Sequence, residues 1–227
     1  MPNSLKGRST SSQQWLIRQL NDPYVKKARY RNYRARSAFK LIEIDEKYRL
    51  LRPGMVVLDC GAAPGAFTQV IVEKLQLNEE KSPNANSFVL AVDKDAIHPI
   101  PGAHVLPNTD FTKPISQAKI FDILNSRKID FICSDMAPNA TGVKSHDHEL
   151  IIGLSFCALT FAVMNLQPKT GAFLTKIWDG SRTPELVSQM EKFFESVKSV
   201  KPLSSRSDSA ESFILGRNFK GIEKLHK

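Results

Sequence analysis

The sequence predicts an α/β fold in which a doubly wound, mostly parallel sheet is flanked by helices. Short apolar segments rich in β-branched residues alternate along the chain with segments of helical periodicity. Four of the apolar segments end in an acid, at Asp59, Asp93, Asp110 and Asp135. A turn rich in glycine and proline follows the first of them, which is where open α/β sheets place their ligands.

The first elements follow one another in the order that such a fold requires. Residues 37–51 carry apolar side chains at helical spacing, with Ser37 as the expected N-cap and a Pro-Gly pair as the stop. The run MVVLD at 55–59 is short, β-branched and bounded by turn residues, which predicts a buried parallel strand. The CGAAPG turn then leads into a helical pattern at 66–77.

The remaining elements are predicted from the same two patterns. Apolar runs bounded by polar loops predict strands at 87–93, 103–110, 129–135, 171–178, 196–202 and 211–216. Helical spacing of apolar residues predicts helices at 114–127, 149–166 and 183–196. Pro114 supports the first of these helices, because proline is favoured in the first turn.

The composition is that of one globular domain. A chain of 227 residues with 41% hydrophobic and 24% charged residues can bury a sizeable core. Cys60, Cys133 and Cys157 lie outside any metal-binding spacing, so we expect no metal, and the odd count favours a reducing compartment. The longest apolar run, 150–166, is interrupted by polar residues and predicts a buried helix, so we expect no membrane contact.

The positive charge of the chain is concentrated near its N-terminus. Residues 1–40 hold ten Lys/Arg and one acid, whereas the rest of the chain carries basic and acidic residues in equal number. We therefore divide the chain into a basic arm, 1–36, and a globular domain, 37–227. A neutral globule with a basic arm suits a phosphate backbone as partner. The expected RNA-binding residues are Lys26, Lys27, Arg29, Arg31, Arg34 and Arg36.

Three other roles of the arm fit the sequence less well. A solvated charged surface usually mixes both signs, and the arm hardly does. A membrane-binding helix needs an apolar face, which does not accompany this charge. A targeting peptide is rich in arginine and serine and poor in acids, and residues 4–12 fit that pattern only weakly.

The acids at the strand ends indicate the chemistry of the ligand. Gly61 and Gly65 let the backbone of the turn approach a ligand closely, but the turn lacks the third glycine of a dinucleotide fingerprint. Asp59 suits an amine or a cation, Asp93 suits two ribose hydroxyls, and Asp110 suits an adenine amino group. Together they fit S-adenosylmethionine, although each aspartate alone could be a helix N-cap.

A second site is expected where lysines meet the strand ends. Lys176 lies inside the apolar run 171–178, and a lysine is rarely buried without a partner. Asp135 and Glu211 begin or end neighbouring strands and are candidate partners. The alternative is an edge-strand lysine that reaches water. Lys40 lies on the helix after the arm, and we expect it to point the same way.

Four motifs, in this order and spacing, resemble the FtsJ/RrmJ-type ribose 2′-O-methyltransferases: DCGAAPGAFTQ, SDMAPNATG, FLTKIW and ESFIL. The resemblance covers roughly residues 13–217, and the SDMAPN loop is similar to that of the branch acting on bacterial and mitochondrial ribosomal RNA. It implies a Rossmann-like methyltransferase fold with S-adenosyl-L-methionine as cofactor. The implied reaction is 2′-O-methylation of a uridine in large-subunit ribosomal RNA.

The resemblance also implies which residues form the site. The family uses a Lys-Asp-Lys-Glu tetrad, whose members match Lys40, Asp135, Lys176 and Glu211. Its cofactor contacts match Gly61, Pro64, Gly65, Ala66, Phe67, Asp93, Asp110 and Asp135. Two positions depart from the family pattern. Phe67 stands where many relatives have tryptophan, and Phe213 replaces a common tyrosine in the last strand.

Methyl transfer to a ribose hydroxyl requires alignment for in-line displacement, and Lys176 is the candidate for orienting that hydroxyl. A neutral Lys176 would accept the proton as a general base, whereas a charged one would stabilise the developing alkoxide. Burial and Lys40 favour the neutral amine, while Asp135 and Glu211 favour the ammonium. The residues alone therefore leave both roles open.

Two other functional classes compete with this interpretation. A catalytically silent RNA-binding or assembly factor would keep the fold, but the intact tetrad argues against it. A nicotinamide-dependent dehydrogenase is disfavoured by the missing third glycine. The resemblance further implies a large-subunit assembly particle as partner, a monomeric enzyme and a mitochondrial location, with a bacterial-type cytoplasmic location as the alternative.

Overall fold

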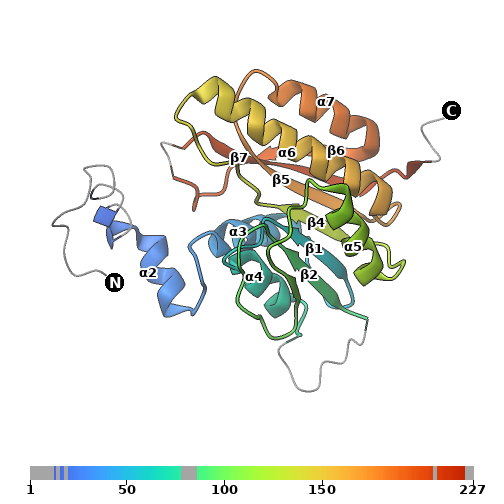
Figure 1. Cartoon of the computed structure of the whole chain (residues 1–227), viewed down its shortest axis with the longest axis horizontal. Coiled ribbons are helices and arrows are strands. Elements are labelled where there is room, and N and C mark those ends of the chain that lie inside the picture. The colour runs from blue at the N-terminus through green and yellow to red at the C-terminus, as the bar shows by residue number, and fades with distance from the viewer. Residues whose placement is uncertain (1–12, 14–15, 18–19, 78–85, 207–208, 223–227) are drawn as a thin grey trace.

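The computed structural model describes residue 13 and residues 16–17, 20–77, 86–206 and 209–222. A seven-stranded sheet forms its centre (Figure 1). The strands are β1 (Val56–Cys60), β2 (Phe88–Val92), β3 (His104–Leu106), β4 (Phe131–Ser134), β5 (Ala172–Trp178), β6 (Phe194–Val200) and β7 (Glu211–Phe219). Their order is β3-β2-β1-β4-β5-β7-β6, in which β7 runs antiparallel to β5 and β6 and the other pairs are parallel. The predicted doubly wound, mostly parallel sheet is confirmed.

Helices cover both faces of this sheet. These helices are α3 (Ala38–Tyr48), α4 (Ala66–Lys74), α5 (Pro114–Leu124), α6 (Lys144–Asn165) and α7 (Thr183–Phe193), and α2 (Pro23–Tyr30) packs on α3. Buried side chains of α3 and α4 pack on one face of the sheet, and those of α5, α6 and α7 pack on the other. The prediction of helices between the strands is therefore confirmed.

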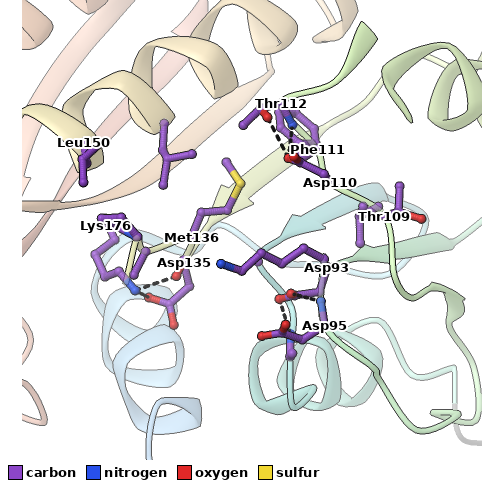
Figure 2. Close-up of a pocket in the computed structure, with 17 residues that line it drawn as sticks. Asp93, Asp95, Thr109, Asp110, Phe111, Thr112, Asp135, Met136, Leu150 and Lys176 are labelled. Carbon is purple, nitrogen blue, oxygen red and sulfur yellow. Dashed lines mark hydrogen bonds and ion pairs between the residues drawn. The ribbon is translucent and has the colours of Figure 1, made fainter. Parts of the chain in front are cut away.

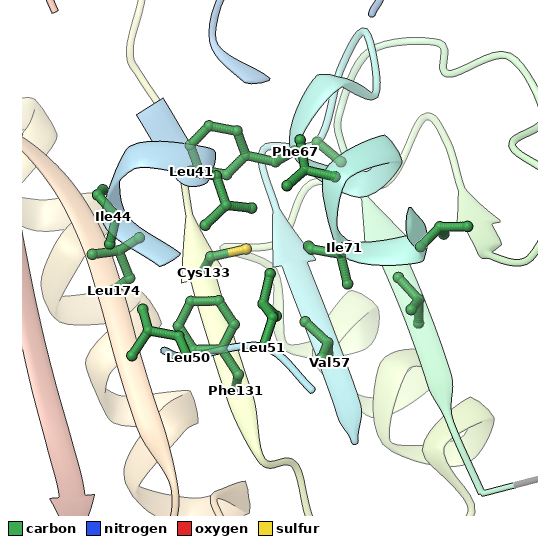
Figure 3. Close-up of a cluster of buried hydrophobic side chains, with 14 of the residues drawn as sticks. Leu41, Ile44, Leu50, Leu51, Val57, Phe67, Ile71, Phe131, Cys133 and Leu174 are labelled. Atoms are coloured by element: carbon green, nitrogen blue, oxygen red, sulfur yellow. The ribbon is translucent and has the colours of Figure 1, made fainter. Parts of the chain in front are cut away.

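Each buried strand contributes side chains to both layers of the core. In β1, Val57 packs toward α3 and α4, whereas Val56 and Leu58 pack toward the opposite layer. Phe131 of β4 lies beside Val57 in the first layer (Figure 3). Because successive side chains of a strand point to opposite faces, a strand covered on both sides is apolar throughout. This is why the strands appear in the sequence as continuous apolar runs.

Four helices, α3, α4, α5 and α7, each end three residues before the end that the sequence predicts, and α6 begins early. α3 ends at Tyr48, before the Pro-Gly pair, because Arg49 adopts the left-handed conformation at φ 54°. The buried Asp45 carboxylate then accepts the N–H groups of Leu50 and Leu51, so these backbone donors beyond the helix have hydrogen-bond partners. Ser37 occupies the N-cap position but makes no side-chain capping bond.

α6 begins at Lys144, five residues before the predicted start. The Asp147 carboxylate accepts the N–H groups of Thr141 and Gly142, and these bonds fix the loop that enters the helix. α6 is also long and apolar enough to cross a membrane by length and composition alone. Half of its apolar window is buried against the protein, and α6 packs on β5 and α7. This burial is that of a core helix.

The basic arm contains a helix that the apolar periodicity does not predict. The Asp22 carboxylate accepts the N–H of Tyr24 and caps α2, and Pro23 occupies its first position. An acid followed by proline is a typical helix start, so a local signal was present. Tyr24 packs against Phe39 of α3 with ring centroids 5.5 Å apart. The described part of the arm is therefore joined to the globular domain.

The strand order places a switch point between β1 and β4. From β1 the chain proceeds outward to β2 and β3, then returns to β4 on the other side of β1. The segments that leave the carboxyl ends of β1 and β4 therefore diverge, and a crevice forms between them.

Candidate active site

A cavity of about 490 Å³ lies at this crevice (Figure 2). Its walls come from the segments that follow β1, β2, β3 and β4 and from the first half of α6. Small-molecule sites in proteins typically measure ~300–1,000 Å³, so the volume suits a ligand of nucleoside size.

Gly61 brings the turn after β1 against the loop after β4. Its φ of +77° is in the left-handed region, and a Cβ there would lie 2.6 Å from the backbone nitrogen of Met136. Both the conformation and the lack of space therefore require glycine. The close approach at Gly61 is to the loop after β4, and Gly61 and Met136 both line the cavity, so the expected approach to a ligand stays a prediction.

Asp93 is held by two backbone groups on the cavity wall (Figure 2). Its Oδ2 accepts the N–H of Ala63 at 2.8 Å, and its Oδ1 accepts the N–H of Asp95 at 2.8 Å. Each carboxylate oxygen keeps a second lone pair for a ligand hydroxyl. The arrangement can therefore bind a ribose diol, as the sequence predicts for this position.

Asp110 supplies a second fixed acid on the same wall. Its Oδ1 accepts the hydroxyl of Thr112 at 2.7 Å and the N–H of Thr112 at 3.0 Å. The Thr112 hydroxyl bond is the main cause that lowers the pKa of Asp110 below its ordinary value. Asp110 is therefore an acceptor at neutral pH, which fits the expected contact to an amino group.

Lys176 and Asp135 form an ion pair at the cavity wall. The ammonium Nζ lies 3.0 Å from Asp135 Oδ1 and donates to the Asp135 carbonyl oxygen at 2.5 Å (Figure 2). Lys176 is buried, with 7% of its surface exposed, and it lies on β5, an interior strand of the sheet. The alternative of an edge-strand lysine reaching water is therefore wrong, because β5 has neighbours on both sides.

Lys40 and Glu211 form a second ion pair. Lys40 Nζ lies 2.6 Å from Glu211 Oε1 and donates to Oε2 at 2.7 Å. The Ser205 hydroxyl also donates to Glu211 Oε1, at 2.9 Å. Sequence reasoning did not identify Ser205, since a serine in a polar loop carries no distinguishing signal.

The two ion pairs lie on the same face of the sheet. In the antiparallel ladder Lys176 is opposite Phe213, and Trp178 is opposite Glu211, so all four side chains point to one side. Phe213 belongs to the core layer under α3, from which Lys40 projects. The structure thus brings the four predicted tetrad residues together in two pairs around Phe213.

Four predicted cofactor contacts, in the turn and in the first two positions of α4, do not line the cavity. Ala66 and Phe67 are buried in the core layer under α4, and Phe67 stacks on Phe213 with ring centroids 6.3 Å apart. Pro64 and Gly65 lie on the side of the turn that faces the arm, where Arg34 reaches them. The direct contacts expected of these four residues therefore lack support from the cavity geometry.

Asp59 does not face the ligand side either. It is fully buried, accepts the Thr68 hydroxyl at 2.6 Å, and lies 3.5 Å from the Cys133 thiol. Burial is the main cause that raises its pKa to about 7. The expectation that Asp59 meets an amine or a cation is wrong, because its side chain supports α4 from below the turn.

The basic residues of the arm divide into two groups. Lys26, Lys27, Arg29 and Arg31 are exposed on or just after α2. Arg36, by contrast, pairs with Asp22 and donates to the Ser204 carbonyl. Arg34 also uses its guanidinium on the protein itself. Their contacts favour an internal role for Arg34 and Arg36 instead of the expected RNA contact.

Several cavity residues were not anticipated. Met136, Leu150 and Leu154 form an apolar wall, together with Phe111. The helical periodicity of 149–166 predicts that Leu150 and Leu154 face the rest of the protein. It does not distinguish a position in the core from one in the wall of a cavity. Aromatic side chains of the arm are candidates for stacking on RNA bases. Of these, Trp15 lies outside the described residues, and the Tyr33 hydroxyl donates to Glu73 at 2.6 Å. Within the described segments, no cluster of three His, Cys, Asp or Glu residues is arranged for a metal.

The chain is similar to known proteins over almost its whole length. The model of the FtsJ-like methyltransferase family matches residues 33–219. The "rRNA methyltransferase 2, mitochondrial" of Drosophila melanogaster is 50% identical over 220 residues, covering 97% of this chain and 88% of that protein. The "Ribosomal RNA large subunit methyltransferase E" of Xanthobacter autotrophicus is 44% identical and covers 95% and 82%.

A solved structure agrees with these matches. A Plasmodium falciparum protein described as a ribosomal RNA methyltransferase is 30% identical, with a TM-score of 0.72, and the alignment covers 83% of this chain and 100% of that one.

Proposed function

We propose a reaction for this chain from one premise: it belongs to the FtsJ-like methyltransferase family. The chain methylates a ribose 2′-hydroxyl of large-subunit ribosomal RNA, at a uridine. The observation that carries this proposal is the ion pair between the buried Lys176 and Asp135, which both line the cavity. The names of the two relatives above support the choice of ribosomal RNA.

S-adenosylmethionine fits the cavity by its chemistry. Asp93 offers fixed acceptors for a ribose diol, and the ionised Asp110 offers an acceptor for an amino group. Met136 and Leu150 offer apolar surface for a base. Bound there, S-adenosylmethionine supplies a sulfonium methyl group, whose C–S bond breaks, leaving its electron pair on sulfur, as the new O–C bond forms.

The tetrad residues act on the RNA hydroxyl. Lys176 orients the hydroxyl, and the Asp135 side chain and carbonyl hold the Lys176 ammonium in place. The hydroxyl proton passes to Lys176 if its amine is neutral, or to water if Lys176 remains charged. Lys40 and Glu211 form the second pair on the same face and complete the polar surface that the ribose meets.

The exposed basic residues of α2 hold the RNA backbone. Lys26, Lys27, Arg29 and Arg31 present positive charge on the helix that packs on α3, the helix that carries Lys40. Phosphate contacts of this kind fix the register of a nucleic acid without reading its sequence. The arm therefore positions the RNA, and the choice of nucleotide falls to contacts nearer the tetrad.

The reaction takes place on a large-subunit assembly particle in mitochondria, and the protein acts as a monomer. Two relatives named as mitochondrial support this location. The alternative is a bacterial-type cytoplasmic location, which the bacterial relatives support. Fractionation of cells that express the tagged chain, with a mitochondrial matrix marker, decides between the two. Sedimentation of the purified protein tests the monomer.

The deciding experiment is methyl transfer from labelled S-adenosylmethionine to large-subunit particles that lack the modification. We expect wild type and Lys119→Ala, which removes an exposed lysine of α5, to label a ribose, and Lys176→Ala to lose transfer while still binding the cofactor. If wild type binds the cofactor and labels no RNA, the silent assembly factor replaces the enzyme. Equal labelling by Lys176→Ala would remove Lys176 from the proposal.

A further inference from the structure

The side chain of Arg34 joins two loops that are far apart in the sequence. Its Nη1 donates to the carbonyl oxygens of Pro64, at 3.0 Å, and His98, at 2.8 Å. Its Nη2 donates to the carbonyl oxygen of Pro99 at 2.7 Å. The backbone N–H of Arg34 is itself fixed by the side chain of Gln69 on α4, at 2.8 Å. The guanidinium therefore bridges three carbonyl groups from a fixed position.

Both bridged loops form walls of the cavity at their other ends. Residues 61–65 contribute Gly61 and Ala63, and residues 93–100 contribute Asp93 and its neighbours. On the cavity side the loops meet at the bond between the Ala63 N–H and the Asp93 carboxylate. On the outer side they meet at Arg34. The joint between the loops is thus held from both sides.

Gly65 provides the space for this arrangement. It adopts φ +113°, and a Cβ there would lie 2.9 Å from Arg34 Nη1 and 2.6 Å from Ile100 Cδ1. The second glycine of the turn therefore accommodates Arg34 and the 93–100 loop, whereas Gly61 accommodates the loop after β4. At both glycines the space that a Cβ would occupy is therefore filled by the protein itself, and Gly65 does not line the cavity.

We propose that Arg34 is a positioning residue of the cofactor cavity, an inference that rests on the proposed function. Its guanidinium holds residues 61–65 and 93–100 at the spacing at which Asp93 meets the ribose of S-adenosylmethionine. The guanidinium presents its N–H donors from separate nitrogens in a rigid planar fork, and this lets it bond carbonyls of both loops at once. A single lysine ammonium on a flexible stem satisfies fewer of them and leaves the loops free to separate.

The test compares Arg34→Gln and Arg34→Lys with Arg31→Gln, which removes an exposed charge three residues away. Isothermal titration measures the Kd of S-adenosylmethionine, with no RNA present. Filter binding measures the affinity for deproteinised large-subunit ribosomal RNA over a range of salt concentrations. We expect both Arg34 variants to weaken cofactor binding roughly tenfold to a hundredfold, from the loss of charge-assisted hydrogen bonds. The slope of the logarithm of RNA affinity against the logarithm of salt concentration, the salt slope, should match that of wild type for both variants.

Arg31→Gln should give the opposite result, with unchanged cofactor binding and a salt slope reduced by about 0.7–0.9 for one lost phosphate contact. Cofactor binding by Arg34→Lys at the wild-type Kd overturns the inference. That variant keeps the charge and the alkyl stem, so it decides the question where Arg34→Gln fails to fold. A wild-type protein that binds no S-adenosylmethionine would instead refute the proposed function, which separates the two failures.

Discussion

Phe213 on β7 lies directly opposite Lys176 on β5 in the antiparallel pairing of the two strands. The Lys40 ammonium lies 5.9 Å from the centroid of the same ring. A phenyl ring thus occupies the position between the two lysines of the tetrad, where many relatives were expected to carry a phenol. In this chain Lys176 is fixed by the carboxylate and the backbone carbonyl of Asp135, and Lys40 is fixed by the carboxylate of Glu211.

The first prediction concerns the role of Lys176. Lys176→Arg keeps the positive charge but cannot act as a base, so we expect methyl transfer to fall by about 10²–10⁴-fold, the usual contribution of a general base. Single-turnover rates between pH 6 and 9 provide the measurement, and Lys119→Arg on the exposed face of α5 provides the control. A rate close to wild type would exclude the base and leave the electrostatic role.

The second prediction concerns the support of Glu211. Ser205→Ala removes the hydroxyl that donates to Glu211 Oε1, a bond worth about 1 kcal/mol, so we expect the rate to fall roughly fivefold with the cofactor Kd unchanged. Ser204→Ala is the matched control, because the buried Ser204 hydroxyl has no hydrogen-bond partner among the described residues. Equal rates for the two variants would show that Ser205 does not position Glu211.

The third prediction concerns the basic surface of α2. Lys26→Ala combined with Arg31→Ala removes two exposed charges, and we expect weaker RNA binding with a salt slope lower by roughly 1.5. Cofactor affinity, measured by titration, should stay at the wild-type value. The control carries Lys119→Ala and Lys169→Ala, which remove two exposed charges elsewhere. A salt slope equal to wild type would place the RNA on another surface.

The fourth prediction follows from the buried carboxyl of Asp59. Burial raises its pKa to about 7 from an ordinary value of 3.8, so the folded state holds this proton more tightly than the unfolded chain does. The resulting stabilisation is complete below about pH 4 and is lost as the pH rises through 7. The amide introduced by Asp59→Asn stays neutral at every pH, so this variant should gain stability relative to wild type between pH 5 and 8.

Urea unfolding of wild type and Asp59→Asn at pH 5, 6.5 and 8 measures this effect. The difference in unfolding free energy should grow by a few kcal/mol across the range, in favour of the variant. Asp122→Asn, an exposed aspartate of α5, controls for the loss of a surface charge. A difference that stays constant with pH would mean that Asp59 is ionised throughout.

The sequence alone predicts the fold and much of the site, because both depend on local patterns. Continuous apolar runs predict β1, β2, β4 and β5, since strands buried on both faces need apolar side chains at every position. Acids at the ends of such strands then meet at one edge of a parallel sheet, which is why Asp93, Asp110 and Asp135 line one cavity. The four tetrad residues are predicted from the resemblance of their motifs to a family. No local pattern in the sequence predicts that Lys40 and Glu211 form a pair.

What only the tertiary structure decides is which partner each polar group meets. Arg31 and Arg34 belong to one basic run in the sequence, yet Arg31 is exposed and Arg34 binds three carbonyls of two distant loops. Asp59 and Asp93 both end apolar runs of the sequence, yet Asp59 is fully buried and Asp93 lines the cavity. Periodicity in the sequence indicates which positions face the core. It can do so because the burial of apolar surface is non-directional and requires no particular partner. Hydrogen bonds and ion pairs depend on distances of a few ångströms between segments remote in the chain, and only the folded structure sets those distances.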